Sequence, residues 1–184
     1  MSDMDKVYIR PLRIEDALIS CHWRNNPKIW RYTYSKPDRY ITPEIETEWL
    51  AGVLKRENEK RFAICLQAND RYIGNVFLSE IDGKQGVLHT FIGEIEFWGK
   101  SRALQAICQI FDYGFKELIL ERIVTDININ NRASMALATR LGMEKMSQQY
   151  DEKVKADSAR FQITREMFDQ GVHLKSLAEN NADK

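Results

Sequence analysis

The stretch Phe97-Trp98-Gly99-Lys100-Ser101-Arg102-Ala103 joins a segment of strand character, residues 89–93, to a run up to residue 118 with apolar side chains at helical spacing. A strand-to-helix turn of small and basic residues suits a phosphate group, because the first N–H groups of a helix lack partners and its dipole favours negative charge. The basic Lys100 and Arg102 add positive charge, and the small Gly99, Ser101 and Ala103 let a ligand approach the backbone. Taken alone, the stretch favours an ordinary turn with solvated basic residues, because short turns with Gly and Lys are common.

Composition bounds the class of protein. The 184 residues predict one domain over residues 1–164 and a C-terminal tail over 165–184 that is partly helical and then frayed. Lys and Arg number 27 and so do Asp and Glu, so charge gives no support to a nucleic-acid partner. No leader-like or membrane-spanning apolar run is present, which predicts a cytoplasmic protein without a membrane partner. The three cysteines are expected to be buried free thiols, and no residue spacing suggests a metal site.

The pattern along the chain predicts alternating groups of strands and helices. We expect helices that begin near residues 13, 42, 101 and 132, the second of them reaching about residue 57. We expect strands at 7–12, 61–66, 71–78, 86–92, 122–129, 143–146 and 159–163, and helix in the tail up to about residue 177. The order β-α-α-β-β-β-α-β-α-β-β predicts an α+β, or mixed α/β, fold with helices covering a sheet.

A second motif stands downstream of the first: Asn131-Arg132-Ala133-Ser134, ending in Leu141-Gly142-Met143. The two motifs at this interval, with the order of elements around them, closely resemble the GNAT family of acetyl-CoA-dependent N-acetyltransferases. The likeness covers roughly residues 7–163. It is greatest to the branch with ribosomal-protein N-terminal, spermidine and nucleotide-sugar amine acetyltransferases. The resemblance implies a central mixed, mostly antiparallel sheet in which the fourth and fifth strands splay apart.

The resemblance also implies where acetyl-CoA binds. In the family, the turn before the long helix cradles the pyrophosphate of coenzyme A, the free backbone of the preceding strand pairs with the pantetheine arm, and the Asn of the second motif reaches the pantetheine. The matching cofactor-binding positions here are Trp98, Gly99, Lys100, Ser101, Arg102 and Ala103 in the turn, Phe91, Ile92 and Gly93 in the strand, and Asn131 and Ser134 in the second motif. Asn131 also suits a plain helix cap.

Two positions depart from the family pattern. Ser101 stands where the family usually has Gly, and we expect it to be tolerated because a helix N-terminus does not require a positive φ. Ala138 stands where many members carry a Tyr that protonates the departing thiolate. Alanine cannot donate a proton, so another group or water serves, or the step is not needed.

The catalytic candidates are His89 and Glu80. His89 lies beside the expected thioester position, and its ordinary pKa of about 6.5 suits a general base; the alternative is a histidine that only packs on the strand. Glu80 and Asp82 lie at the end of the preceding strand, and either could accept a proton or hold a cationic amine. The alternative is a solvated hairpin, which is favoured for Asp82. The backbone N–H groups near residues 91–93 would stabilise the oxyanion.

The acceptor pocket is expected near the end of the first helix, where the sequence His22-Trp23-Arg24-Asn25-Asn26-Pro27 resembles a signature of GNAT members that act on sugar amines. Stacking on a ring and pairing with a phosphate or carboxylate are the expected roles of Trp23 and Arg24. Tyr34 extends the same aromatic and basic surface. The predicted substrate-binding residues are Trp23, Arg24, Asn25 and Tyr32; the alternative is a helix end with an ordinary aromatic anchor.

The prediction is therefore an acetyl-CoA-dependent N-acetyltransferase that moves an acetyl group to a primary amine by direct attack. The acceptor is an amino sugar or a protein N-terminus. The alternative is a non-catalytic acyl-CoA-binding or sensor domain on the same fold. The expected partner is this amine acceptor. A homodimer is one possible assembly, and the sequence does not determine the oligomeric state.

Overall fold

A computed structural model describes residues 5–32, 37–152 and 156–174. In the described part, seven strands form one sheet in the order β1-β2-β3-β4-β5-β7-β6. The strands are β1 (Val7–Pro11), β2 (Lys60–Leu66), β3 (Tyr72–Ser79), β4 (Gln85–Ile92), β5 (Arg122–Asn128), β6 (Glu144–Asp151) and β7 (Ala156–Thr164). All neighbouring pairs are antiparallel except β4 and β5, which confirms the predicted mixed sheet.

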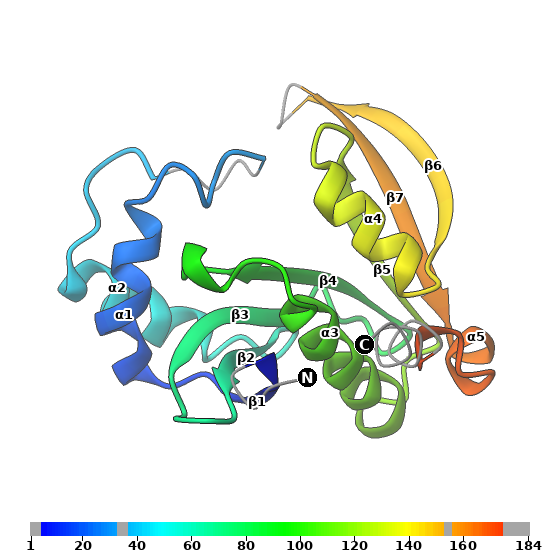
Figure 1. The fold of residues 1–184 in the computed structure, drawn as a ribbon, viewed down its shortest axis with the longest axis horizontal. Coiled ribbons are helices and arrows are strands. Elements are labelled where there is room, and N and C mark those ends of the chain that lie inside the picture. Colours follow the sequence, from blue (N-terminus) through cyan, green and yellow to red (C-terminus); the bar gives the residue numbers. More distant parts are fainter. Residues whose placement is uncertain (1–4, 33–36, 153–155, 175–184) are drawn as a thin grey trace.

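The helices lie on both faces of this sheet. They are α1 (Ala17–Arg24), which continues a 3-10 turn at Ile14–Asp16, α2 (Pro43–Val53), α3 (Arg102–Asp112), which continues into a π-helical turn at Tyr113–Glu117, α4 (Arg132–Arg140) and α5 (Arg165–Asp169). Figure 1 shows α1 and α2 together on one side of the β1–β4 half and α3 on the other. None of the helices in the described ranges is long and apolar enough to cross a lipid bilayer.

Local sequence explains several of these boundaries. The side chains of Thr42, Asn131 and Thr164 each accept a hydrogen bond from the backbone N–H three residues later, so each caps a helix. Gly142 has a φ of +70° directly after α4, a left-handed conformation that glycine adopts at low cost. The helix starts near residues 42 and 132 are therefore confirmed and have a local cause.

Three predicted boundaries were wrong. The helix from residue 42 ends at Val53 rather than near 57, and the strand predicted at 143–146 continues to Asp151. The helix after β7 stops at Asp169, because Gly171 turns the chain with a φ of +70°. Helical backbone resumes only at 172–174. The rest of the predicted tail helix and the frayed end at 178–184 lie outside the described residues.

The core forms two clusters, one on each face of the sheet. The larger one joins α3 to β3, β4 and β5 through fully buried side chains such as Leu78, Leu104 and Phe111. The smaller one packs α1 and α2 on the other face, around Trp23, Leu50 and Ala63. All three cysteines are buried free thiols, as expected. The sheet thus has a covered face on each side, and its open feature is the place where strands separate.

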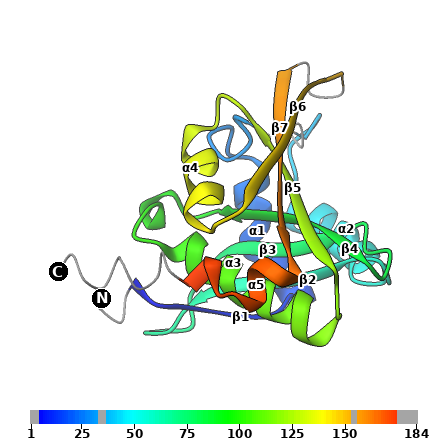
Figure 2. The same cartoon turned by 90° about the vertical axis from the view of Figure 1, so that its right-hand side faces the viewer.

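That place is the junction of β4 and β5. Parallel pairing joins only Gln85–Val87 to Arg122–Val124, after which the two strands diverge. Turned by 90°, β5, β7 and β6 rise steeply from the layer formed by β1–β4 (Figure 2). The predicted splay is confirmed, and it leaves the second half of β4 without a neighbour on that edge.

Candidate functional site

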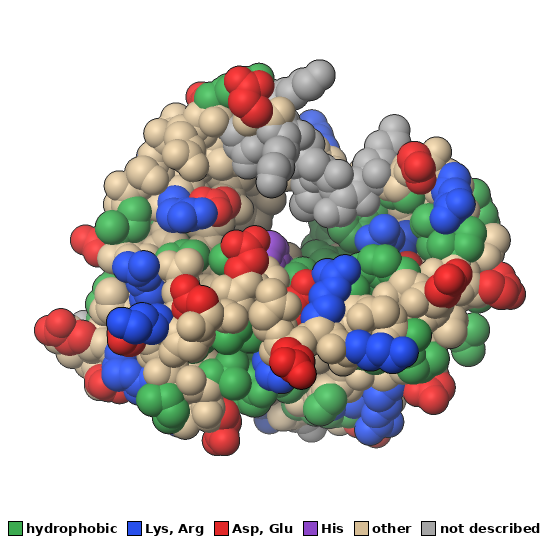
Figure 3. Space-filling model, turned by 180° about the vertical axis from the view of Figure 1, so that it is seen from behind, with side chains coloured by type: hydrophobic (Ala, Val, Ile, Leu, Met, Phe, Trp, Pro, Cys, Tyr) green, Lys and Arg blue, Asp and Glu red, His purple; other side chains and the backbone are tan. Residues whose placement is uncertain are grey.

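A cavity of about 310 Å³ occupies the space between the two diverging halves of the sheet. It is lined from one side by α1, α2, β2, β3 and β4 and from the other by β5 and α4, so the second sequence motif contributes to it, whereas no residue from 92 to 103 is in its lining. Seen from behind, the space-filling surface is deeply hollowed between two lobes (Figure 3). This volume is in the range of small-molecule sites.

The free edge of β4 forms one wall. The N–H of Gly93 donates to the carbonyl of Ile73 at 2.8 Å, and pairing alternates back along the strand, so Phe91 and His89 bond to β3. The backbone groups of Thr90 and Ile92 consequently point toward the open side. Among the predicted residues 91–93, only Ile92 directs its backbone N–H outward, and Thr90 shares this orientation, so the N–H groups of Phe91 and Gly93 are bonded to β3 and are not open to a ligand on this edge.

The turn before α3 contains three successive residues in the left-handed conformation. The φ angles of Gly99, Lys100 and Ser101 are +81°, +51° and +61°. The expectation that Ser101 needs no positive φ was therefore wrong, because the chain must reverse sharply between the 3-10 turn at Ile95–Phe97 and α3. Within the described ranges, the backbone N–H groups of Gly99, Lys100, Ser101 and Ala103 have no hydrogen-bond acceptor. Such an array of free N–H groups suits an anion.

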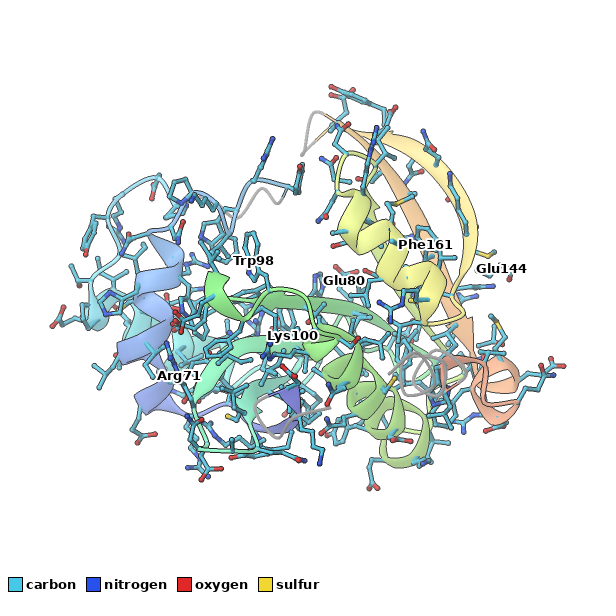
Figure 4. All side chains as sticks on the ribbon, in the orientation of Figure 1. Arg71, Glu80, Trp98, Lys100, Glu144 and Phe161 are labelled. Carbon is cyan, nitrogen blue, oxygen red and sulfur yellow. The ribbon has the colours of Figure 1, made fainter. Side chains whose placement is uncertain are left out.

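The two basic side chains of this turn have different roles. Arg102 is 4% exposed at its side chain and forms an ion pair with Asp5 at 2.8 Å, so it is a buried structural cation rather than the mobile phosphate ligand that was predicted. Lys100 is 66% exposed, although its Nζ lies 3.3 Å from the same carboxylate. Figure 4 shows Lys100 near the start of α3 and Trp98 on the same connection. Trp98 is half exposed and donates from its indole to the carbonyl of Ile92.

The second motif lines the cavity from the other side. Asn131 and Ser134 are both half-buried in the wall, and the Asn131 amide oxygen accepts the Ser134 N–H at 3.2 Å. The helix-cap interpretation of Asn131 is therefore confirmed. Its amide N–H₂ group has no hydrogen-bond partner among the described residues and can still donate to a ligand. Ala138 also lines the cavity and is buried. The position at which many GNAT members carry a proton donor thus faces the site with a methyl group.

The acceptor end of the cavity is bounded by rings and guanidinium groups that stack one on the next. The His89 ring stacks on Phe77 at 4.5 Å, Arg61 lies 3.9 Å above Phe77, and Trp49 is contacted by Arg61 at 5.4 Å and by Arg24 at 5.1 Å. Arg24 continues to Trp30 at 5.4 Å, and Trp30 returns to β4 at Phe91 at 5.5 Å. We call this closed set the stacked belt: His89, Phe77, Arg61, Trp49, Arg24, Trp30 and Phe91.

His89 is the titratable group of the belt that lies nearest to the splay. Its Nε2 is 2.8 Å from the Ser79 hydroxyl. Water reaches the ring through the cavity, yet protein atoms surround it on most sides, and this burial lowers its pKa to about 4, with a further contribution from the positive charge of Arg61. The imidazole is therefore neutral at neutral pH, not half-titrated as its ordinary value predicted.

Glu80 does not join His89 in this geometry. It is exposed at the end of β3, has a φ of +52° and is not among the described residues that line the cavity. Its φ makes it part of the turn that leads to the β3–β4 hairpin, so the structure gives no support to a catalytic Glu80. Asp82 accepts two backbone hydrogen bonds inside the same hairpin, which matches the interpretation of a solvated turn.

Two of the four predicted substrate residues have structural duties instead. Trp23 is 3% exposed, packs on Tyr72 and donates its indole N–H to Glu94 at 2.9 Å, so it is an anchor whose edge reaches the cavity rather than a free stacking surface. Asn25 binds the backbone of Cys21 and Ile41 with three hydrogen bonds, which fixes the segment that precedes α2. Trp23 still lines the cavity, and the substrate roles of Trp23 and Asn25 stay predictions, although backbone and core groups already bind these side chains.

Arg24 and Tyr32 do line the cavity, while Tyr34 lies outside the described residues. The residues that sequence reasoning missed are Glu46, Trp49, Arg61, Phe77 and Asp126. Strand alternation carries a partial signal for Arg61, because it shares a face with the buried Ala63 and Cys65. No comparable signal exists for α2, where a run of glutamates resembles a solvated face. In the described part of the chain, no group of three metal-ligating side chains is found.

The fold and the site define an acyl-CoA-dependent transferase architecture, and comparison with known proteins agrees. Residues 6–144 match the family model described as the acetyltransferase (GNAT) domain. The probable N-acetyltransferase YjcK of Bacillus subtilis is 30% identical over 76% of this chain and 81% of its own length. The uncharacterized N-acetyltransferase p20 of Bacillus licheniformis is 27% identical over 77% and 80%. The structure of spermidine N-acetyltransferase from Vibrio cholerae, solved with CoA and spermine, superposes with a TM-score of 0.79 at 23% identity, covering 88% of this chain and 97% of that one.

This protein belongs to the GNAT acetyltransferase family. It is accordingly an acetyltransferase enzyme whose acyl donor is acetyl-CoA, as the two motifs implied. The chain's own features fit this donor: free backbone N–H groups at 99–101 suit a pyrophosphate, and the open edge of β4 suits the amide-bearing pantetheine arm.

Proposed function

We propose that this enzyme acetylates a primary amine that binds inside the stacked belt, with the acceptor nitrogen near His89. The observation that carries the proposal is that one cavity is lined both by Asn131, which is predicted to contact the pantetheine, and by the belt residues Arg24 and Trp49. Donor and acceptor therefore share one enclosure. A small-molecule amine, such as an amino sugar, suits a closed belt better than a protein N-terminus, which must bring a chain with it.

Acetyl-CoA supplies a thioester carbon that bonds to the amine nitrogen while the carbon–sulfur bond breaks, and the proton lost by the amine ends on the thiol. The backbone N–H of Thr90, on the open edge of β4, is placed to donate to the carbonyl oxygen as charge develops there. Donation from a fixed backbone group costs no reorganisation, which is why such groups stabilise developing charge efficiently.

His89 handles the proton in this proposal. With a pKa of about 4 it does not remove a proton from a free ammonium, so the amine enters neutral. The nitrogen becomes acidic as it bonds to the carbonyl carbon, and the neutral imidazole then accepts its proton. In the tautomer that carries the proton on Nε2, His89 donates to the Ser79 hydroxyl and Nδ1 is left for this role. Because the imidazolium is a strong acid, it releases the proton toward the departing sulfur, and no tyrosine at position 138 is required.

The test is the release of free thiol from acetyl-CoA over a panel of primary amines. At least one small amine should be turned over, and His89→Ala should lower kcat by about a hundredfold, the lower end of the range for a positioned base. His22→Ala, an exposed histidine on α1, is the matched control and should keep full activity. Absence of turnover with every amine, despite measurable affinity for CoA, would contradict the proposed function. Full activity of His89→Ala at all pH values would remove His89 from it.

A further inference from the structure

The guanidinium of Arg24 is held inside the cavity without hydrogen bonds. It lies between Trp30 and Trp49, and its Nε is 3.7 Å from the Glu46 carboxylate, which is beyond hydrogen-bond distance. That Nε is buried, and no N–H of the Arg24 side chain bonds to any residue in the described ranges. A guanidinium carries five donors, and leaving buried donors unpaired is costly. The π faces of the two tryptophans hold the cation in place but satisfy none of its donors.

A second cation lies beside it. Arg61 shares the Trp49 ring with Arg24 and stacks on Phe77 at 3.9 Å. Glu59 binds the Nε and Nη2 of Arg61 at 2.8 and 2.7 Å, which leaves Nη1 without a hydrogen-bond partner among the described residues. Two like charges on one tryptophan repel each other, so this arrangement favours an anion between or against them.

The carboxylates near the two arginines leave some of the guanidinium N–H donors without a hydrogen bond. Asp126 is engaged by Arg160 through two hydrogen bonds of 2.9 and 2.6 Å. Glu46 is 2% exposed and accepts from the Ser20 hydroxyl at 2.8 Å; its Oε2 lies 3.7 Å from the Arg24 Nε, an ion pair without a hydrogen bond. Among the arginine donors at the acceptor end, those of Arg24 and the Nη1 of Arg61 have no hydrogen-bond partner in the described ranges.

Resting on the proposed function, we propose that the acceptor amine carries an anionic group, a carboxylate or a phosphate, which binds Arg24 with Arg61 as the second cation. A planar guanidinium matches either oxyanion through paired hydrogen bonds. His89 and Arg61 both contact the Phe77 ring, so the amine and the anion flank one aromatic ring. A compact molecule with an amine at one end and an anion at the other therefore suits the two sides of this ring. An extended polyamine places a second positive charge against the arginines.

The first test compares matched amines on the unaltered enzyme by thiol release. Glucosamine 6-phosphate is paired with glucosamine, and β-alanine with β-alaninamide, so that each pair differs in the anion; spermidine is the cationic probe. We expect kcat/KM to be at least about tenfold higher for one anionic member than for its neutral partner, as a charge-assisted hydrogen bond predicts. Which pair shows the gain distinguishes phosphate from carboxylate. Equal rates within both pairs, or spermidine as the best substrate, would overturn the inference and leave the proposed function standing; no turnover at all would contradict both.

The second test uses variants of the two arginines. Arg24→Gln and Arg61→Gln should each raise KM for the anionic amine by about tenfold or more, while KM for acetyl-CoA and the activity with the neutral partner change little. Arg24→Lys keeps the charge without the planar fork and should fall between. Arg122→Gln, an exposed arginine bonded to Gln85 at the closed end of the splay, is the matched control. Equal losses for the anionic and neutral amines in variants that keep the melting temperature would show a purely structural role.

Discussion

Replacing Gly93 by alanine should destabilise this protein through Trp23 and not through the loss of a ligand contact. A Cβ built on Gly93 would lie closer than 3.0 Å to the indole atoms Cδ2, Cε2 and Cε3 of Trp23. The backbone at Gly93 is not left-handed, so the effect is steric. The indole has little freedom to move, because Tyr72 packs against it at 4.6 Å and Glu94 accepts its N–H at 2.9 Å.

The magnitude follows from these contacts. Overpacking a well-ordered core costs about 1–3 kcal/mol, and displacing the indole from Glu94 adds about 1 kcal/mol. We therefore expect Gly93→Ala to lower the free energy of unfolding by about 3 kcal/mol, or the melting temperature by roughly 6–12 °C for a chain of this size. Trp23→Leu makes room at this position, so the cost of Gly93→Ala in that background should fall below about 1 kcal/mol.

The assay is urea unfolding of the two single variants and the double variant, analysed as a cycle. Gly52→Ala is the control: nothing lies within 4 Å of its added Cβ, it sits in α2, and it should gain up to about 1 kcal/mol from helix propensity. Additive effects of Gly93→Ala and Trp23→Leu, within about 0.5 kcal/mol, would refute the steric coupling. A loss of CoA affinity with unchanged stability would instead return Gly93 to a purely ligand-binding role.

Three further outcomes are expected. Ser101→Gly should raise the free energy of unfolding, measured in urea, by about 0.5 kcal/mol. The reason is that relief of the strain at a φ of +61° in the folded state outweighs the greater conformational entropy of glycine in the unfolded chain. A net loss of stability would contradict strain at this turn. Arg102→Met should cost about 1.5–3 kcal/mol because it removes the buried charge-assisted contact to Asp5 at 2.8 Å, whereas the exposed Lys100→Met should change stability by less than about 0.5 kcal/mol. Similar losses for both variants would argue against a buried pair. The folded state lowers the pKa of His89 to about 4 from about 6.5, so between these pH values unfolded chains bind more protons than folded ones. The stability that is present above pH 6.5 should therefore be lost as the pH falls toward 4. His89→Gln should flatten this dependence of stability on pH, and an unchanged dependence would contradict the shift.

Local features of this chain were predictable because their causes are local. The helix starts at Thr42 and Asn131 follow from side chains that bond the backbone three residues ahead, and the long helix after Ser101 follows from apolar spacing. The motif pair indicated the family and the donor. Helix ends were harder to predict: nothing near Val53 marks the stop of α2, and only Gly171 marks the end of α5.

The site was predictable only where one segment makes it. The turn at 98–103 was placed correctly as a helix start with free N–H groups, yet its backbone angles were not, because three left-handed residues in a row have no residue-type signal apart from Gly99. Arg102 was expected to face a phosphate. Its partner Asp5 lies 97 positions away, and sequence spacing carries no information about such a pair.

The order of residues in this chain specifies which segments become strands and helices, which face of each is apolar, and that a turn of free N–H groups precedes α3, because these depend on neighbours within a few positions. The stacked belt depends on α1, α2, β2, β3 and β4 meeting around the splay. Only the tertiary structure determines that Arg24 has no hydrogen bonds within the described residues, that Arg102 has a buried partner, and that the pKa of His89 is lowered. A charged side chain acquires its function from the dielectric and the partners around it, and those are set by contacts between distant segments.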